Sequence, residues 1–220
     1  MLFLIGSPIG NLGDITLRAL EVLKEVAIIA AEDTRRSSIL LKRFQISKPL
    51  ISFHEHNEAR RTSELIERLA AGEKVALLTD AGMPSISDPG YRLVRACIES
   101  GIRIEVIPGP SAVLTALVGS GLPTDRFYFG GFLPVKSGQR ERELLAALAR
   151  GFTSIYFESP HRIVRSLEVL RRADPARLIC VARELTKQFE EYRRGDAASV
   201  LAHYEAHPPK GEITLVISGT

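Results

Sequence analysis

The chain has 220 residues, of which 45% are hydrophobic and 25% charged, and this globular composition excludes long disordered stretches. Its length suits one large α/β domain or two smaller ones. A formal net charge of +3 permits a polyanionic partner but is far below that of a dedicated nucleic-acid-binding protein.

Targeting and redox signals indicate the cell interior. The only two cysteines, Cys97 and Cys180, lie far apart and are interpreted as small core residues of a protein in a reducing compartment. The N-terminus carries no basic leader, and no apolar run approaches the ~18 residues of a membrane span. We therefore expect a cytoplasmic protein without a membrane anchor.

The first half of the chain alternates apolar runs with helical patterns. The runs lack polar alternation, as is typical of parallel strands covered on both faces, and lie at residues 2–5, 26–31, 75–78 and 104–107. Helices are expected between them, with Leu17, Leu20 and Leu23 on one face of the helix at residues 16–25. In the helix at residues 57–71, Asn57 is expected to cap the start. This alternation predicts a parallel sheet with helices on both faces.

The Leu-Pro-Thr-Asp-Arg segment that begins at Leu122 interrupts this pattern. Strands are then expected at residues 154–157, 178–182 and 213–218, around two helical stretches, one of them at residues 162–172. We therefore predict two lobes, residues 1–121 and residues 122–220, the second with a mixed sheet. The basic face of the helix at residues 162–172 is interpreted first as a solvated surface.

Three loops rich in glycine and proline follow predicted strands, at residues 6–14, 80–90 and 108–112. Open α/β sheets bind their ligands at this edge, although any one of these loops could be simple strand-to-helix punctuation. The glycine spacing of the first loop is not GxGxxG, so the dinucleotide fingerprint is excluded, and the chain has no GxxxxGK[ST] loop of a nucleotide hydrolase.

Several polar segments invite a chemical interpretation that the residues alone do not support. His54 and His56 lack further ligands at a suitable spacing, so no metal site is predicted. No nucleophile elbow surrounds Ser159, which disfavours a Ser/His pair with His161. The segments at residues 32–36 and 183–187 place carboxylates beside cations, and structural ion pairs are the first interpretation there.

Six motifs in order carry a family resemblance: GSPIGNLGD, AAEDTR, DAGMPSISDPG, PGPSA, FESPHR and ARELTK. The chain resembles the tetrapyrrole-methylase-like class of methyltransferases, and within it the ribosomal RNA small subunit methyltransferase I subfamily. The resemblance covers residues 2–217 and implies a homodimer of two-lobed α/β subunits with S-adenosylmethionine in the cleft between the lobes. The first loop is poorer in glycine than in the tetrapyrrole-modifying relatives, which favours the RNA subgroup.

The implied reaction is methyl transfer to a cytidine ribose 2′-hydroxyl in the decoding region of 16S ribosomal RNA, with the RNA or the 30S subunit as substrate. A tetrapyrrole C-methyltransferase and a non-catalytic ribosome assembly factor are the alternatives. Members of the subfamily often continue into a further helical segment, so with Thr220 as its last residue this chain is expected to be truncated or to depend less on that segment for RNA affinity.

The resemblance also implies roles for individual residues. The cofactor contacts are expected at Pro8, Ile9, Asp80, Gly82, Met83, Ser85, Ile86, Ser111, Ala112, Phe157, Ala182, Glu212 and Ile213. Ile86 and Ile213 could enclose the adenine between them. Because a ribose hydroxyl must lose its proton, we expect Glu184 or Lys187 to act as general base, with Asp33 and Arg35 positioning the acceptor. Phosphate contacts are expected from Arg35, Arg36, Arg60, Arg61, Lys136, Arg140 and Arg162.

Overall fold

A computed structural model describes residues 1–219 of the chain. It divides into two compact units, Met1–Ser111 and Ala112–Thr220. Helix α5 (Ala112–Ser120) packs on strands of the second unit and therefore belongs to it, so the boundary lies at the start of this helix. The boundary expected after residue 121 lies at the other end of the same helix.

The first unit contains one sheet whose five strands are all parallel, in the order β3-β2-β4-β1-β5. The strands are β1 (Leu2–Ile5), β2 (Ile28–Ala31), β3 (Leu50–Ser52), β4 (Val75–Leu78) and β5 (Ile104–Ile107). The helices are the short η1 (Leu12–Asp14), α1 (Leu17–Glu25), α2 (Thr34–Arg43), α3 (Glu58–Ala70) and α4 (Tyr91–Glu99). The expected parallel sheet is confirmed.

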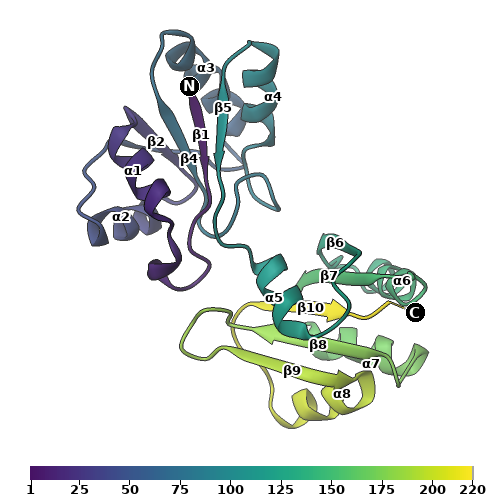
Figure 1. The fold of residues 1–220 in the computed structure, drawn as a ribbon. Helices are drawn as coiled ribbons and strands as arrows, with labels where there is room; N and C mark the ends of the chain where they lie inside the picture. Colours follow the sequence, from purple (N-terminus) through teal and green to yellow (C-terminus); the bar gives the residue numbers. More distant parts are fainter. Residues whose placement is uncertain (220) are drawn as a thin grey trace. The chain divides into compact units, whose positions relative to one another are not determined.

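Helices cover both faces of this sheet (Figure 1). Successive side chains of a strand point to opposite faces. Accordingly, Phe3 and Ile5 of β1 pack in the cluster that contains residues of α1 and α2. Leu2 and Leu4 pack in the cluster that contains residues of α3 and α4. This double burial explains why the strands are apolar without alternation.

Two local expectations in the first unit are wrong. Leu17 does not face the core: it is 79% exposed, and Ala19, Val22 and Leu23 form the buried face of α1. Asn57 does not cap α3 with its side chain. Its Oδ1 instead accepts a hydrogen bond from the His54 backbone N–H at 2.9 Å, and this contact fixes the turn that follows β3.

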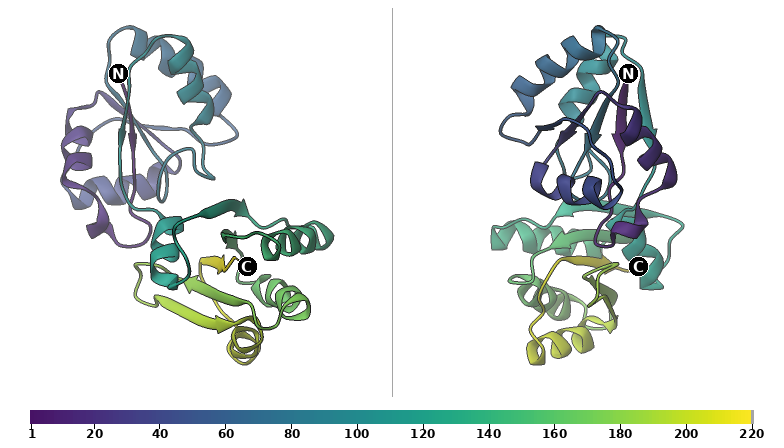
Figure 2. Two further views of the ribbon diagram at one scale, coloured as in Figure 1. Left: turned by 45° about the vertical axis from the view of Figure 1, so that its right-hand side comes forward. Right: turned by 90° about the vertical axis from the view of Figure 1, so that its left-hand side faces the viewer.

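The second unit contains a mixed sheet in the order β6-β7-β10-β8-β9 (Figure 2). Strands β6 and β7 are parallel, whereas β10 is antiparallel to both β7 and β8, and β8 is antiparallel to β9. The strands are β6 (Phe127–Phe132), β7 (Thr153–Glu158), β8 (Leu178–Arg183), β9 (Glu191–Asp196) and β10 (Ile213–Ile217). Besides α5, the helices are α6 (Ser137–Leu148), α7 (Ile163–Ala173) and α8 (Ala197–Ala206). The expected mixed sheet is confirmed.

The core of the second unit lies on one face of this sheet. Side chains of α6, α7 and α8 form a single cluster there with Tyr156, Val181 and Leu215 of the strands. Helix α5 packs against β10, β8, β7 and β9. Within residues 1–219, no helix is long and apolar enough to cross a membrane.

Candidate functional site

The three glycine- and proline-rich loops of the first unit are tied together at the carboxyl edge of its sheet. Ser7 and Gly82 exchange backbone hydrogen bonds of 2.8 and 3.0 Å, which join the loop after β1 to the loop after β4. The Ser7 hydroxyl donates to the Thr79 carbonyl at 2.8 Å. Gly6 N–H donates to the Ile107 carbonyl at 3.1 Å and so joins the first loop to the end of β5. These bonds make the three loops one structure.

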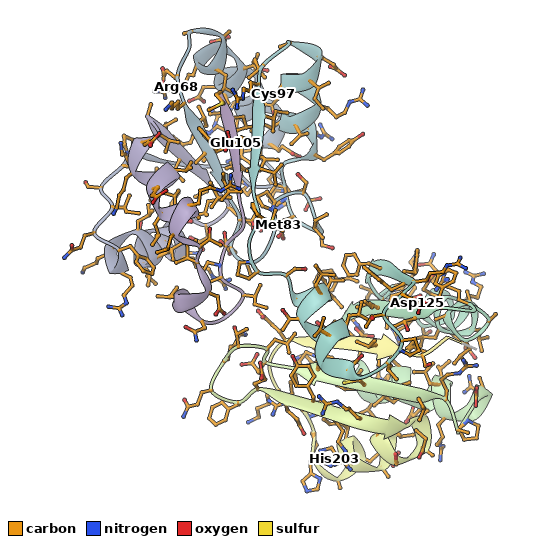
Figure 3. The ribbon with its side chains drawn as sticks, in the orientation of Figure 1. Arg68, Met83, Cys97, Glu105, Asp125 and His203 are labelled. Carbon is orange, nitrogen blue, oxygen red and sulfur yellow. The ribbon has the colours of Figure 1, made fainter. Side chains whose placement is uncertain are left out.

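Two glycines allow the first and third loops to touch. A Cβ on Gly6 would lie 2.7 Å from Gly109 Cα and 2.8 Å from Met83 Sδ. A Cβ on Gly109 would lie 2.8 Å from Gly6 Cα. Both distances are far below a carbon–carbon contact, so only glycine fits at either position. Met83 lies beyond the ends of the strands in Figure 3, at this meeting of the loops.

The loop after β4 has a backbone that few sequences would adopt. Ser85 and Ser87 have φ angles of 70° and 64°, in the left-handed region that non-glycine residues rarely occupy. Gly90 ends the loop at φ 136°, and its N–H donates to the buried Glu58 carboxylate at 2.9 Å. Such strain persists only where the surroundings fix it, and it is often found at functional sites.

Charged groups gather where β2 and β4 end. Asp80 N–H donates to Glu32 Oε2 at 3.1 Å, and Asp33 N–H donates to Asp80 Oδ1 at 3.1 Å. Arg35 binds the Asp33 carboxylate through Nε and Nη2 at 3.0 and 2.7 Å, and Arg36 Nη1 lies 3.2 Å from Asp80 Oδ2. The hydrogen bond from the Arg35 side chain holds the pKa of Asp33 well below its ordinary value. Asp33 is therefore an anion that caps α2.

Asp88 differs from these carboxylates because no cation neutralises it. It is partly buried in the loop after β4, and within residues 1–219 its side chain has no hydrogen bond or ion pair. Burial, followed by repulsion from Glu32 and then Asp80, raises the pKa of Asp88 to about 7. The sequence motif contained this residue, but nothing in its pattern singled it out from Asp80.

In the second unit, two of the expected cofactor contacts lie on one face of the sheet, on either side of Thr214. The register pairs Thr214 of β10 with Phe157 of β7 and with Ala182 of β8, and directly paired residues share a face. Phe157 also makes edge contacts with the rings of Phe129 and Phe132, at centroid distances of 5.0 and 5.2 Å.

Ile213 does not belong to this face, which corrects its expected adenine contact. It is 3% exposed and lies in the core cluster with residues of α6, α7 and α8. Since neighbouring residues of a strand point to opposite faces, Thr214 and not Ile213 shares the face of Phe157 and Ala182. The sequence carried no signal for this choice, because the face that each residue of β10 shares with Phe157 and Ala182 depends on the register of the strands.

The expected general bases form a compact ionic cluster. Lys187 Nζ donates to Glu184 Oε1 at 2.9 Å and to Glu212 Oε2 at 3.0 Å, and Glu212 N–H donates to Glu184 Oε1 at 2.9 Å. A Cβ on Gly211 would overlap the Glu184 carboxylate. The hydrogen bond from Lys187 lowers the pKa of Glu184. Although burial opposes it, pairing with the two glutamates raises the pKa of Lys187. Both shifts favour the charged forms, as in a structural ion pair, and a catalytic role for either residue stays a prediction.

Three of the expected phosphate contacts are engaged within the protein. Arg140 is buried, and its guanidinium donates to the Pro134 and Val135 carbonyls at 3.2 and 3.0 Å, so its expected role on the surface is wrong. Arg162 Nε donates to the buried Glu158 carboxylate at 3.0 Å. Arg61 Nη1 lies 2.5 Å from Glu64 Oε2 and is mostly buried. The exposed members of the expected set are Arg35, Arg36, Arg60 and Lys136.

The polar segments without an expected function have structural partners. His54 Nε2 lies 3.1 Å from Asn57 Nδ2, so this ring packs in the turn after β3. Ser159 Oγ accepts a hydrogen bond from the His161 backbone N–H at 3.2 Å. In the part of the chain that the structure describes, no group of three or more His, Cys, Asp or Glu side chains could hold a metal ion.

The sequence of the chain matches a known family. Residues 1–201 match the family described as Tetrapyrrole (Corrin/Porphyrin) Methylases. The chain belongs to this family and, within it, to the ribosomal RNA small subunit methyltransferase I group, as the following relatives indicate. The resemblance read from the six motifs is thereby confirmed.

Curated relatives with the name Ribosomal RNA small subunit methyltransferase I match nearly the whole chain. The protein of Thermotoga maritima is 46% identical over 99% of this chain and 98% of its own length. That of Mesorhizobium japonicum is 51% identical over 98% of this chain and 74% of its own length. That of Escherichia coli O157:H7 is 46% identical over 99% of this chain and 77% of its own length.

Solved structures share the fold at lower identity. A diphthine synthase aligns with a TM-score of 0.74 and 16% identity, over 99% of this chain and 89% of that one. A cobalt precorrin-4 methyltransferase of cobalamin biosynthesis aligns with a TM-score of 0.72 and 16% identity, over 99% and 94%. The uroporphyrin-III-C-methyltransferase of Thermus thermophilus aligns with a TM-score of 0.68 and 22% identity, over 99% and 93%. These likenesses confirm the expected fold class.

Proposed function

We propose that this protein is an S-adenosylmethionine-dependent methyltransferase of small-subunit ribosomal RNA, and that its acceptor is a cytidine ribose 2′-hydroxyl of the decoding region in 16S RNA. The observation that carries the proposal is the identity of 46 to 51% with relatives of that name over 98 to 99% of this chain. The three joined loops at the sheet edge support it, because open α/β sheets bind their ligands there.

The first unit offers a suitable place for this cofactor. At Gly82, whose φ is 79°, an added Cβ would lie 3.8 Å from Ile9 Cγ2 and 3.8 Å from the Pro110 carbonyl oxygen, so the first and third loops both approach this glycine. The Thr79 and Ser85 hydroxyl oxygens are buried without a hydrogen-bond partner. The Glu32 carboxylate accepts the Asp80 N–H and is paired with no cation within residues 1–219, which suits a neighbouring ammonium or sulfonium.

We propose that the nucleoside of the cofactor is enclosed by residues of these loops: Pro8, Ile9, Gly82 and Met83. Further cofactor contacts are proposed at Ser85, Ile86, Ser111 and Ala112. Asp80 would act through its backbone because its carboxylate is already engaged by Arg36 and Asp33. From the second unit we propose Phe157, Ala182 and Glu212, with Thr214 in place of Ile213.

When bound, S-adenosylmethionine supplies a methyl group that its sulfonium has already activated. The residues of the chain must then align the acceptor oxygen, an effect worth up to about 11 kcal/mol, and help to remove its proton. Asp33 and Arg35 form an anion–cation pair at the start of α2, and the Arg35 side chain is 89% exposed, so an acceptor phosphate could reach its guanidinium from solvent. Glu184 and Lys187 remain the sequence-derived choice for the base.

The exposed cations Arg35, Arg36, Arg60 and Lys136 are proposed to contact RNA phosphates, with the naked RNA or the 30S subunit as substrate. We also propose that the protein works as a homodimer in the cytoplasm. Light scattering of the purified protein tests the dimer directly, because a monomer at micromolar concentration would contradict it.

Methyl transfer is tested with labelled S-adenosylmethionine and three acceptors: 30S subunits, naked small-subunit RNA and a porphyrinoid. Incorporation into RNA at an alkali-resistant linkage is expected, since 2′-O-methylation removes the hydroxyl that attacks the phosphodiester. Label in the porphyrinoid alone would indicate a tetrapyrrole C-methyltransferase. Cofactor binding without transfer to any acceptor would indicate a non-catalytic assembly factor.

A further inference from the structure

The carboxylates near the ligand loops of the first unit differ in what neutralises them. Asp33 is bound by Arg35, and Asp80 lies beside Arg36. Glu58 lies 3.7 Å from Arg92 and accepts the Gly90 N–H. Glu32 has no such cation but accepts the Asp80 N–H. Asp88 alone of these five has neither a cation nor a hydrogen-bond donor in the part of the chain that the structure describes.

The backbone fixes the position of Asp88. Ser87 precedes it with φ at 64°, Pro89 follows it, and the Pro89 carbonyl accepts the Ser85 N–H at 3.3 Å. Gly90 ends the loop and donates its N–H to Glu58. Only glycine fits at this position, because a Cβ would lie 2.7 Å from Ser85 Oγ. The loop is thus tied at both sides of Asp88, so the backbone of this residue is fixed while its carboxyl group makes no bond within residues 1–219.

Unsatisfied polar atoms lie in the same stretch of chain. Thr79 is 2% exposed, and its Oγ1 has no hydrogen-bond partner. Ser85 Oγ is also buried without a partner. Buried polar atoms in proteins are normally hydrogen-bonded, so two orphans in the segment that leads from β4 to Asp88 indicate a place where another polar molecule completes the bonding.

We propose that Asp88 is the catalytic proton acceptor of the methyl transfer, taking the proton of the acceptor hydroxyl onto its carboxylate. This inference rests on the proposed function. The acceptor oxygen forms its bond to the methyl carbon as the carbon–sulfur bond breaks, and sulfur keeps that electron pair as a neutral thioether. The hydroxyl proton passes to an Asp88 oxygen and then to water, so charge and atoms balance.

The electrostatic environment of Asp88 suits a proton acceptor better than the environments of the other carboxylates do. A general base works best when its pKa lies near the working pH. Burial and the neighbouring Glu32 and Asp80 raise the pKa of Asp88 to about 7, whereas pairing with Arg35 lowers that of Asp33 and pairing with Lys187 lowers that of Glu184. The other charged groups of this region are Arg36 on Asp80, and Glu58 with Arg92 at the end of the loop.

The first experiment measures the titration of the Asp88 carboxyl group in the absence of methyl transfer. Carbon-13 spectra of protein labelled at the aspartate carboxyl carbons are recorded between pH 4 and pH 9, in the absence of cofactor. One resonance is expected to titrate near pH 7 in the wild type and to be missing in Asp88→Asn. An Asp88 resonance that titrates at the ordinary value near 4 would overturn the assignment.

The second experiment measures single-turnover methyl transfer to 30S subunits against pH. Asp88→Asn is expected to lower the rate at pH 7.5 by about 100-fold or more, the usual contribution of a general base. The acidic limb of the profile should vanish, while cofactor affinity measured by calorimetry changes by less than about tenfold. Compared with Asp88→Asn, Asp88→Glu should restore part of the rate and an acidic limb of the pH–rate profile. Asp125→Asn, at an exposed position of the second unit, is the matched control.

The outcomes separate this inference from the function on which it rests. A wild type that binds cofactor but transfers no methyl group to RNA refutes the proposed function. Transfer by the wild type, with Asp88→Asn keeping both its rate and its acidic limb, refutes the role of Asp88 alone. If Glu184→Gln or Lys187→Met instead lost the rate while cofactor binding stayed intact, the general base would be assigned to Glu184 or Lys187.

Discussion

Replacing either glycine at the meeting of the first and third loops by alanine should separate these loops. The new Cβ would lie 2.7 Å from the facing Cα in Gly6→Ala and 2.8 Å in Gly109→Ala. Carbon atoms pack at about 3.5–4.0 Å, so the two backbones would have to move apart by about 1 Å. Backbone cannot yield as a flexible side chain does, and the bonds between Ser7 and Gly82 oppose the movement.

The cost follows from these contacts. Overpacking costs about 1–3 kcal/mol, and weakening one loop hydrogen bond adds about 1 kcal/mol. We expect each variant to lose about 2–3 kcal/mol of stability in the first unit. For a loss of about 2 kcal/mol, amides of β1 and β4 should exchange with solvent about 30-fold faster. Cofactor affinity should fall in parallel, because the loops no longer meet.

Hydrogen exchange followed by mass spectrometry measures both units in one sample. Exchange in β8 and β10 of the second unit should not change. Gly138→Ala is the control: this residue lies in α6 with nothing within 4 Å of an added Cβ, so alanine should be neutral or stabilise by up to about 1 kcal/mol. If Gly6→Ala and Gly109→Ala both exchange like the wild type, the close contact of the loops is wrong.

Further predictions concern single groups. Asp88→Asn should stabilise the first unit progressively as pH rises from 4 to 7, because a raised pKa means that folding disfavours the ionised carboxyl group. The full shift corresponds to about 4 kcal/mol, which solvent screening reduces to about 2 kcal/mol; a difference in hydrogen exchange that does not vary with pH would contradict this. Glu158→Gln should destabilise the second unit by about 3 kcal/mol in urea, since Arg162 loses its buried partner; unchanged unfolding would show that the pair contributes nothing. Ile213→Ala should cost about 2–5 kcal/mol with cofactor affinity retained, whereas Thr214→Leu should weaken cofactor binding in calorimetry; the reverse pattern would restore Ile213 to the site. RNA affinity should fall steeply between 50 and 200 mM salt in filter binding, and a flat response would argue against phosphate contacts.

Much of the fold could be predicted because burial on two faces leaves a strong mark on a strand. The fully buried strands β1 and β4 occupy the residues expected from their apolar runs, and so does β5, an edge strand that is only partly buried. The missed strands carry a weaker mark. β3 has three half-buried residues, β6 contains two glycines, and β9 reads EYRRGD at the edge of its sheet. An edge strand has only one neighbour, so polar side chains are tolerated there.

The site could be predicted at the level of loops but not of side-chain direction. The three loops lie at the edge of the sheet where ligands were expected, whereas Ile213 faces the core and Thr214 the opposite face, because one residue along a strand reverses the face. Arg140 and Arg162 were likewise expected to contact RNA phosphates, and only the fold shows their partners inside the protein. Asp88 became distinct once the structure gave every neighbouring carboxylate a partner.

The paired hydrogen bonds between Ser7 and Gly82 have a dynamic consequence. Because each loop is an anchor for the other, neither can fluctuate open alone without breaking both bonds. The loops should then come apart in one cooperative event, so that the platform exists either whole or not at all. A ligand that occupies it would slow that event for the entire sheet edge, and protection from exchange on binding should extend from β1 across β4 to the end of β5.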